Sequence, residues 1–117
     1  MIDPLVSPSV PPERDAAVSA WMSRHGWKTA GARWEVEPES GFYVWEEEAV
    51  DGKRTHALWI EEAMLQHLTA EELIQVLDRE GMVEEIRISF RVRIEERGAE
   101  YRISVVPRKS GGFRRPE

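Results

Sequence analysis

Apolar side chains recur at helical spacing in two stretches of the chain, which predicts two amphipathic helices. The first stretch covers residues 12–25, and Gly26 follows it as a residue able to end a helix in the left-handed conformation. The second begins at Thr69, which forms a capping box with Glu72, and ends at Gly81. The side chains expected on the buried sides are Ala17, Val18, Trp21, Met22, Leu73, Val76 and Leu77.

Asp51-Gly52 joins two strand-like runs, residues 42–50 and 53–60. This dipeptide tolerates positive φ at both positions, so it favours a two-residue type I′ hairpin. The resulting register places Glu47 opposite His56 and divides the apolar side chains between two faces. The faces are Tyr43, Trp45, Leu58 and Ile60 on one side, and Phe42, Val44, Ala57 and Trp59 on the other. Both faces are therefore expected to be covered.

The strictest alternation lies between residues 86 and 94, where apolar and polar residues take turns without interruption. Such period-two alternation predicts a strand. Residues 96–99 are expected to form a turn, and a shorter strand follows over residues 101–105. Residues 33–37 are expected to form one further short strand, and residues 61–67 a short helical turn. The last hairpin is apolar on one face and cationic on the other, which is typical of a sheet with one face in water.

These elements predict one α+β domain with the order α-β-β-β-α-β-β, in which antiparallel hairpins pack against two helices. A length of 117 residues suits a single domain. The domain is expected over residues 12–107. Proline-rich residues 1–11 and basic, glycine-containing residues 108–117 are expected to be flexible tails.

The composition excludes several classes of site. The chain has no cysteine, which removes disulfides, thiolate metal ligands and a cysteine nucleophile. No apolar run approaches the roughly 20 residues that span a bilayer, and the first residues lack the features of a signal peptide. A soluble, cytoplasmic protein without a membrane contact is therefore expected. Because no phosphate-binding loop, dinucleotide fingerprint or activated serine occurs, no cofactor and no catalytic residue are predicted.

The net charge of −6 is unevenly distributed. Residues 1–83 carry 7 basic and 16 acidic side chains, a balance of −9, whereas residues 84–117 carry 9 basic and 6 acidic ones, a balance of +3. A net acidic chain argues against nucleic-acid binding. The basic carboxyl-terminal part is better suited to an anionic ligand or an acidic protein surface.

Arginines line one face of the predicted last hairpin. Arg87, Arg91 and Arg93 alternate along one strand, and Arg102 lies across from them. A guanidinium can hold a carboxylate or a phosphate through two N–H donors. The alternative is a solvated face whose charge discourages edge-to-edge association. RNA-binding sheets also present aromatic side chains for stacking, and no aromatic residue alternates with these arginines.

Five tryptophans are many for a chain of this length. Tryptophan buries a large area and is common in both cores and interfaces. Core packing is the simplest interpretation. The alternative is an apolar ligand pocket or a partner surface lined by Trp34, Trp45 and Trp59.

The histidines suggest ion pairs and not a metal site. His56 is expected opposite Glu47, and His67 precedes Glu71 by one helical turn. A histidine–glutamate pair can orient a general base. A metal site, however, needs three or four converging ligands, and no residue spacing in the sequence provides them. No metal is therefore predicted.

These features predict a small non-catalytic protein-interaction or accessory module. Two alternatives stay open, a small-ligand-binding protein with a tryptophan-lined pocket and a nucleic-acid-associated factor that uses the arginine face. The expected partner is another protein or a second copy of the chain. The strand over residues 86–94 is longer than its neighbour and leaves an edge that needs pairing. A homodimer whose interface includes a tryptophan or the last hairpin is therefore expected.

Overall fold

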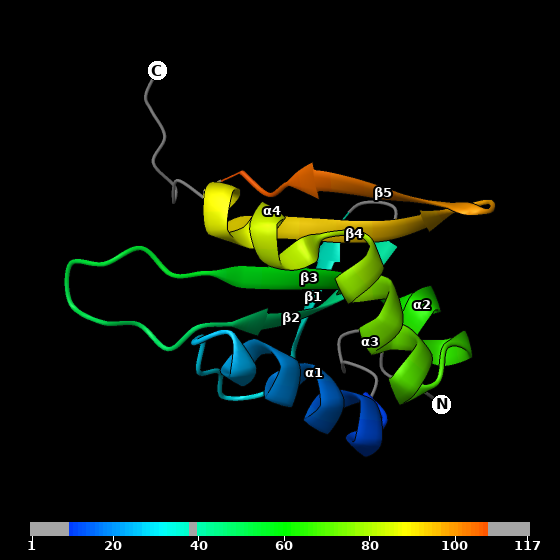
Figure 1. The fold of residues 1–117 in the computed structure, drawn as a ribbon, viewed down its shortest axis with the longest axis horizontal. Helices are drawn as coiled ribbons and strands as arrows, with labels where there is room; N and C mark the ends of the chain where they lie inside the picture. Colours follow the sequence, from blue (N-terminus) through cyan, green and yellow to red (C-terminus); the bar gives the residue numbers. More distant parts are fainter. Residues whose placement is uncertain (1–9, 38–39, 108–117) are drawn as a thin grey trace.

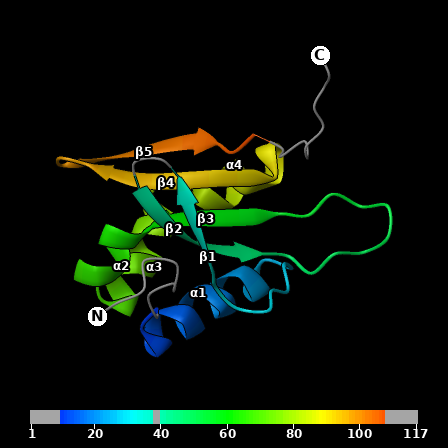
Figure 2. The same ribbon diagram turned by 180° about the vertical axis from the view of Figure 1, so that it is seen from behind.

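The computed structural model describes residues 10–37 and 40–107. One sheet with the strand order β1-β2-β3-β4-β5 packs against helices (Figures 1 and 2). All neighbouring strands are antiparallel except β3 and β4, which are parallel. The elements are α1 (Pro12–Arg24), β1 (Arg33–Glu37), β2 (Ser40–Glu46), β3 (Ala57–Glu61), α2 (Glu62–His67), α3 (Ala70–Arg79), α4 (Met82–Ser89), β4 (Arg91–Arg97) and β5 (Glu100–Val105). The predicted α+β class and element order are confirmed, with three short helices between β3 and β4.

Both predicted amphipathic helices are present, and all the side chains expected on their buried sides are buried except Ala17, which is only partly buried. Helix α1 is followed by Gly26 with a φ of 91°. Helix α3 begins at the predicted capping box, in which Glu72 N donates to Thr69 Oγ1 at 3.1 Å and Thr69 N donates to Glu72 Oε1 at 2.9 Å. Gly81 ends it with a φ of 71°. The buried side chains of the two helices are Val18, Trp21, Met22, Leu73, Val76 and Leu77.

Helix α4 occupies the first part of the segment that the alternation predicted to be a strand, so the prediction over residues 86–94 is wrong in its first half. On this helix Met82 and Ile86 lie one turn apart and both are buried, whereas Ile88 is 74% exposed. Strand β4 begins at Arg91. Helical spacing, which begins at Met82, explains why Ile86 is buried and Ile88 is exposed; strict alternation would bury both isoleucines.

Phe90 forms the junction between α4 and β4. It has a φ of 72° and a ψ of −54°, a conformation that is rare for a residue other than glycine. Its N–H donates to Ile86 O at 2.8 Å, and its carbonyl accepts from Ala57 N at 2.8 Å. One residue therefore closes the helix and also attaches the start of β4 to the start of β3.

The first hairpin has the predicted register but a different tip. Residues 47–56 form a long loop that projects from the sheet (Figure 1). Lys53 N donates to Val50 O at 2.9 Å, but of the two central residues only Gly52 has a positive φ, of 73°. Asp51 does not, so the turn is not the predicted type I′, which needs a positive φ at both positions.

The core lies on both faces of the sheet. The main cluster fills the space between the sheet and the helices and includes Trp21, Tyr43, Trp45, Leu58, Ile60, Leu77, Ile86 and Ile94. The opposite face, here called the helix-free face, carries the smaller cluster Phe42, Val44, Ala57, Trp59 and Val106. Both faces of the first hairpin are thus buried, as the sequence predicts.

The predicted tails lie almost entirely outside the described residues. Val10 and Pro11, at the end of the predicted first tail, are described: Val10 packs against the main cluster, and Pro11 O accepts from Arg14 N and Asp15 N, both at 3.0 Å. Within the described ranges, no helix combines the length and the apolar character needed to cross a membrane.

Candidate functional site

The helix-free face carries three of the four arginines predicted for a binding surface. The register of β4 and β5 places Arg91, Arg93 and Arg102 on this face. Arg87 lies on α4 instead, where its Nη1 donates to Glu84 Oε2 at 3.1 Å. It leaves the predicted set because residues 82–89 are helical and not part of the sheet.

The tryptophans proposed as a pocket do not converge. Trp45 is fully buried on the helix-covered face, and its Nε1 donates to Asp15 Oδ1 at 2.9 Å. Trp34 packs against Tyr43, with ring centroids 5.0 Å apart. Trp59 belongs to the cluster on the opposite face. A tryptophan-lined pocket therefore has no geometric basis among these three residues.

Glu46 holds one side of Arg91 in place. In the sheet these two residues flank Ala57, and Arg91 Nη1 reaches across this small residue to Glu46 Oε2 at 2.8 Å. Arg33 Nη1 binds Glu46 Oε1 at 2.7 Å, and Thr55 Oγ1 donates to Glu46 Oε2 at 2.7 Å. Burial raises the pKa of Glu46, but these hydrogen bonds outweigh it, and the pKa lies below its ordinary value.

Arg91 keeps a second donor that is buried and unused. Its Nε has no acceptor among the described residues, and neither does Nε1 of Trp59 on the same face. Buried N–H groups in folded proteins almost always have a hydrogen-bond partner. The two N–H groups therefore need an explanation, and an acceptor supplied by a ligand or by another chain is one.

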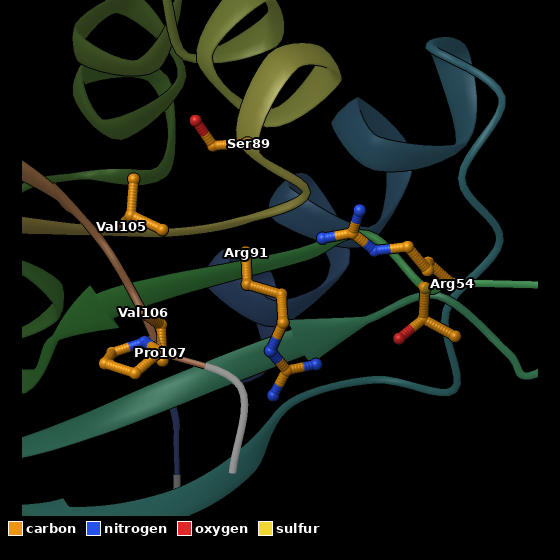
Figure 3. A pocket seen from close by; sticks show the side chains of 7 residues that line it. Arg54, Ser89, Arg91, Val105, Val106 and Pro107 are labelled. Carbon is orange, nitrogen blue, oxygen red and sulfur yellow. The ribbon is translucent and has the colours of Figure 1, made fainter. Parts of the chain in front are cut away.

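Arg91 lines a pocket of about 170 Å³ at the end of the sheet where β3 and β4 begin and β5 ends. Figure 3 shows Arg54 and Arg91 entering it from different segments, the loop before β3 and the start of β4. Two arginines and two hydroxyl-bearing residues thus line a small space with an apolar wall. The lining residues are Arg54, Thr55, Ser89, Arg91, Val105, Val106 and Pro107.

An aromatic column supports Arg54 although this residue is exposed. The Cζ atom of Arg54 lies 4.2 Å from the ring centroid of Phe90, a favourable cation–π distance. Phe90 stacks on His56 at 4.5 Å, and His56 stacks on Trp27 at 5.2 Å. The predicted pair of His56 with Glu47 is confirmed, with Nδ1 2.7 Å from Oε1. The column therefore orients the loop that carries Arg54.

The sequence analysis missed Arg54, Thr55 and Ser89 as site residues. All three lie in a loop or at a helix end, where neither the two-residue period of a strand nor the 3.6-residue period of a helix indicates which way a side chain points. His67 was also assigned the wrong partner: its Nε2 lies 2.7 Å from Glu96 Oε1, on β4, and not beside Glu71. Among the residues that the structure describes, no three metal-binding side chains converge.

Aromatic residues do lie on the arginine face, although none alternates with the arginines along β4. They come from the neighbouring strands, Phe42 from β2 and Trp59 from β3. They are only 1% and 5% exposed, and the guanidinium carbon of Arg93 lies 5.5 Å from the Phe42 centroid. Bases cannot stack on rings that are covered in this way, so the face lacks the platform of an RNA-binding sheet.

In comparisons with known proteins, no family model, no curated protein and no solved structure matches this chain.

Proposed function

We propose that the chain is a non-catalytic interaction module that binds a carboxylate of a partner protein in the pocket between Arg54 and Arg91. The observation that carries the proposal is the buried Nε of Arg91, which has no acceptor within the described residues. Because Nη1 is bound to Glu46, we assign the carboxylate to the other edge of the guanidinium, which carries Nε. A carboxylate can take this edge through two parallel hydrogen bonds.

The charge of the pocket favours a carboxylate over a phosphate. Glu46 compensates Arg91 at 2.8 Å, whereas Arg54 has a ring contact and no ion pair among the described residues. One uncompensated positive charge matches a singly charged group better than a phosphate, which carries nearly two negative charges. The apolar wall of Val105, Val106 and Pro107 suits the methylene groups of a glutamate or aspartate side chain.

The proposal can be tested by nitrogen-15 NMR with a hexaglutamate peptide as the probe. We expect saturable shifts at the amides of Thr55, Ser89 and Val106 and at the Arg91 Nε–H signal. Arg91→Gln should weaken binding by about tenfold or more, since it removes a charge-assisted hydrogen-bond pair. Arg97→Gln, at the far end of the same strand, is the matched control and should bind as well as the unmodified protein.

Shifts that persist in Arg91→Gln, or that spread evenly over the surface, would contradict the proposal. Two further probes separate the alternatives. Inorganic phosphate tests whether any small anion suffices. A single-stranded oligonucleotide that binds more tightly than the peptide, with a steep salt dependence, would favour the nucleic-acid-associated function instead.

A further inference from the structure

Strand β5 is an edge strand, and no described element lies beyond it (Figures 1 and 2). Its register shows which backbone groups are unused. Val106 N donates to Arg91 O at 2.9 Å, and in an antiparallel ladder hydrogen-bonded pairs alternate with non-bonded ones. Arg102 and Ser104 therefore also bond to β4. The residues whose N–H and C=O groups point outward are Tyr101, Ile103 and Val105.

We propose that this outer edge pairs antiparallel with β5 of a second copy of the chain, with Ile103 at the two-fold axis, and that Glu100 of the second copy supplies the carboxylate for the pocket. This inference rests on the proposed function, because it names the partner of the same site. The identical strands form one continuous sheet across the dimer, which satisfies the outward backbone groups of both copies.

The alternating backbone pattern restricts the possible registers. With Ile103 at the axis, Tyr101 faces Val105 of the second copy, and every outward residue meets an outward residue. A shift by one residue would bring inward-facing groups opposite outward-facing ones. Centring on Tyr101 would run the pairing into the turn at Gly98, which has a φ of 64°.

Registers centred on Arg102 or on Ser104 also pair outward groups with outward groups. The first sets Arg102 opposite Arg102 of the second copy, two like charges, and the second sets Tyr101 opposite Pro107, which has no N–H to donate. The Ile103 register avoids both faults.

Charge agrees with the same register. Arg102 faces Ser104 of the second copy, so no like charges stand directly opposite each other, a placement that would weaken pairing. Val105 is 56% exposed in the single chain. In the dimer it lies beside Tyr101 of the second copy, and a β-branched residue opposite an aromatic one is a favourable cross-strand pair.

Glu100 of the second copy then lies opposite Val106, on the helix-free face. Arg91, Val106 and this glutamate form one row across three strands. The row Glu46–Ala57–Arg91 already shows a glutamate and an arginine meeting across one intervening strand, at 2.8 Å. Glu100 is exposed and has no ion pair in the described part of the chain. It is therefore placed to meet the unused edge of Arg91.

The test compares Val105→Pro with Val105→Thr by sedimentation equilibrium over a wide concentration range. Proline removes the outward N–H of residue 105 and spares the ladder to β4, because an edge strand tolerates proline where the N–H faces solvent. Threonine keeps the N–H and removes the same valine from the pocket wall, so the contrast between the two variants isolates the N–H group. We expect proline to weaken dimerisation by about tenfold and threonine by less than about threefold. Thermal melting of both variants verifies that each is folded.

Glu100→Gln should also weaken the dimer, and hexaglutamate should compete with dimerisation of the unmodified protein. A protein that stays monomeric but binds hexaglutamate at Arg91 would overturn this inference and leave the proposed function intact. A dimer unaffected by Val105→Pro would overturn the edge pairing. A dimer that depends on residue 105 but ignores both Glu100→Gln and hexaglutamate would overturn the assignment of Glu100 to the pocket.

Discussion

Glu46 makes the stability of the sheet depend on pH. Its pKa lies below the ordinary value of 4.5: burial raises it, but hydrogen bonds from Thr55, Arg33 and Arg91 lower it more. A carboxyl group whose pKa falls on folding stabilises the folded state above its unfolded-state pKa. That stabilisation is lost as the pH falls through the lower, folded-state value.

Glu46→Gln should therefore lower the free energy of unfolding at neutral pH by about 1–3 kcal/mol, because Arg33 and Arg91 lose the charged acceptor of their hydrogen bonds. The difference from the unmodified protein should shrink as the pH falls below about 4.5, where Glu46 of the unfolded chain becomes protonated while its folded-state pKa is lower. Urea unfolding at a series of pH values measures both effects. Glu48→Gln, an exposed neighbour, is the control. A difference that stays constant down to pH 3 would contradict the assignment.

Gly41 is needed because the ring of Trp34 lies where a side chain would be. A Cβ atom at this position would overlap the Trp34 ring. Gly41→Ala should destabilise the fold by about 1–3 kcal/mol, as overpacking does. The cost should be smaller in a Trp34→Leu background, and a double-mutant cycle of unfolding free energies measures this coupling. Additive effects of the two substitutions would show that the contact is not the cause.

Helix α3 shows how an element combines a local signal with long-range packing. Its capping box and apolar stripe can both be recognised in the sequence, and both are present. Helix α4 differs, because its ends depend on contacts elsewhere: Phe90 bonds both to Ile86 and to Ala57 of β3. Helix α3 can therefore be predicted from its own residues, and helix α4 cannot.

Leu77→Ala should lower the free energy of unfolding by roughly 2–5 kcal/mol, because it opens a cavity under α3. Leu77 is completely buried. Thr69→Ala should cost about 1 kcal/mol by removing the cap. Chemical unfolding measures both, and Gln75→Ala on the exposed side of the same helix is the control. An unchanged midpoint for Leu77→Ala would mean that the buried side of α3 is assigned incorrectly.

The parallel pairing of β3 with β4 joins the two parts of the sheet. It places β4 between β3 and β5, so that β4 is paired on both sides. The longer strand, predicted to have an open edge, is paired on both sides and so offers no edge for self-association. The open edge near the pocket belongs to β5 instead. Dimerisation through the last hairpin stays a prediction, now with a different strand and a defined register.

Removal of residues 1–9 and 108–117 should leave the melting transition of the domain intact. Further removal of Val10 and Pro11 should lower the melting temperature, because Val10 packs on the core and Pro11 O accepts two N–H groups of the first turn of α1. Differential scanning calorimetry of the two truncated proteins measures the contrast. Equal melting temperatures would show that residues 10 and 11 add nothing to the fold.

Several features could be predicted from the sequence because they depend on neighbours along the chain. Helices α1 and α3 follow from stripes, caps and terminal glycines. The register of β2 with β3 follows from alternation around Asp51-Gly52. Arg91, Arg93 and Arg102 share a face because period two holds along β4 and β5. In each case the spacing of side chains along the backbone decides the outcome.

Only the tertiary structure decided the rest. Residues 86–89 fit either a strand or the end of a helix, and packing of Met82 and Ile86 against the core selected the helix. The parallel pairing of β3 and β4 then brought Arg54 and Arg91 to one pocket, although they lie far apart in the sequence. Alternation along a strand determines the face of the sheet on which a side chain lies. Contacts between distant segments determine which side chains lie next to each other on that face.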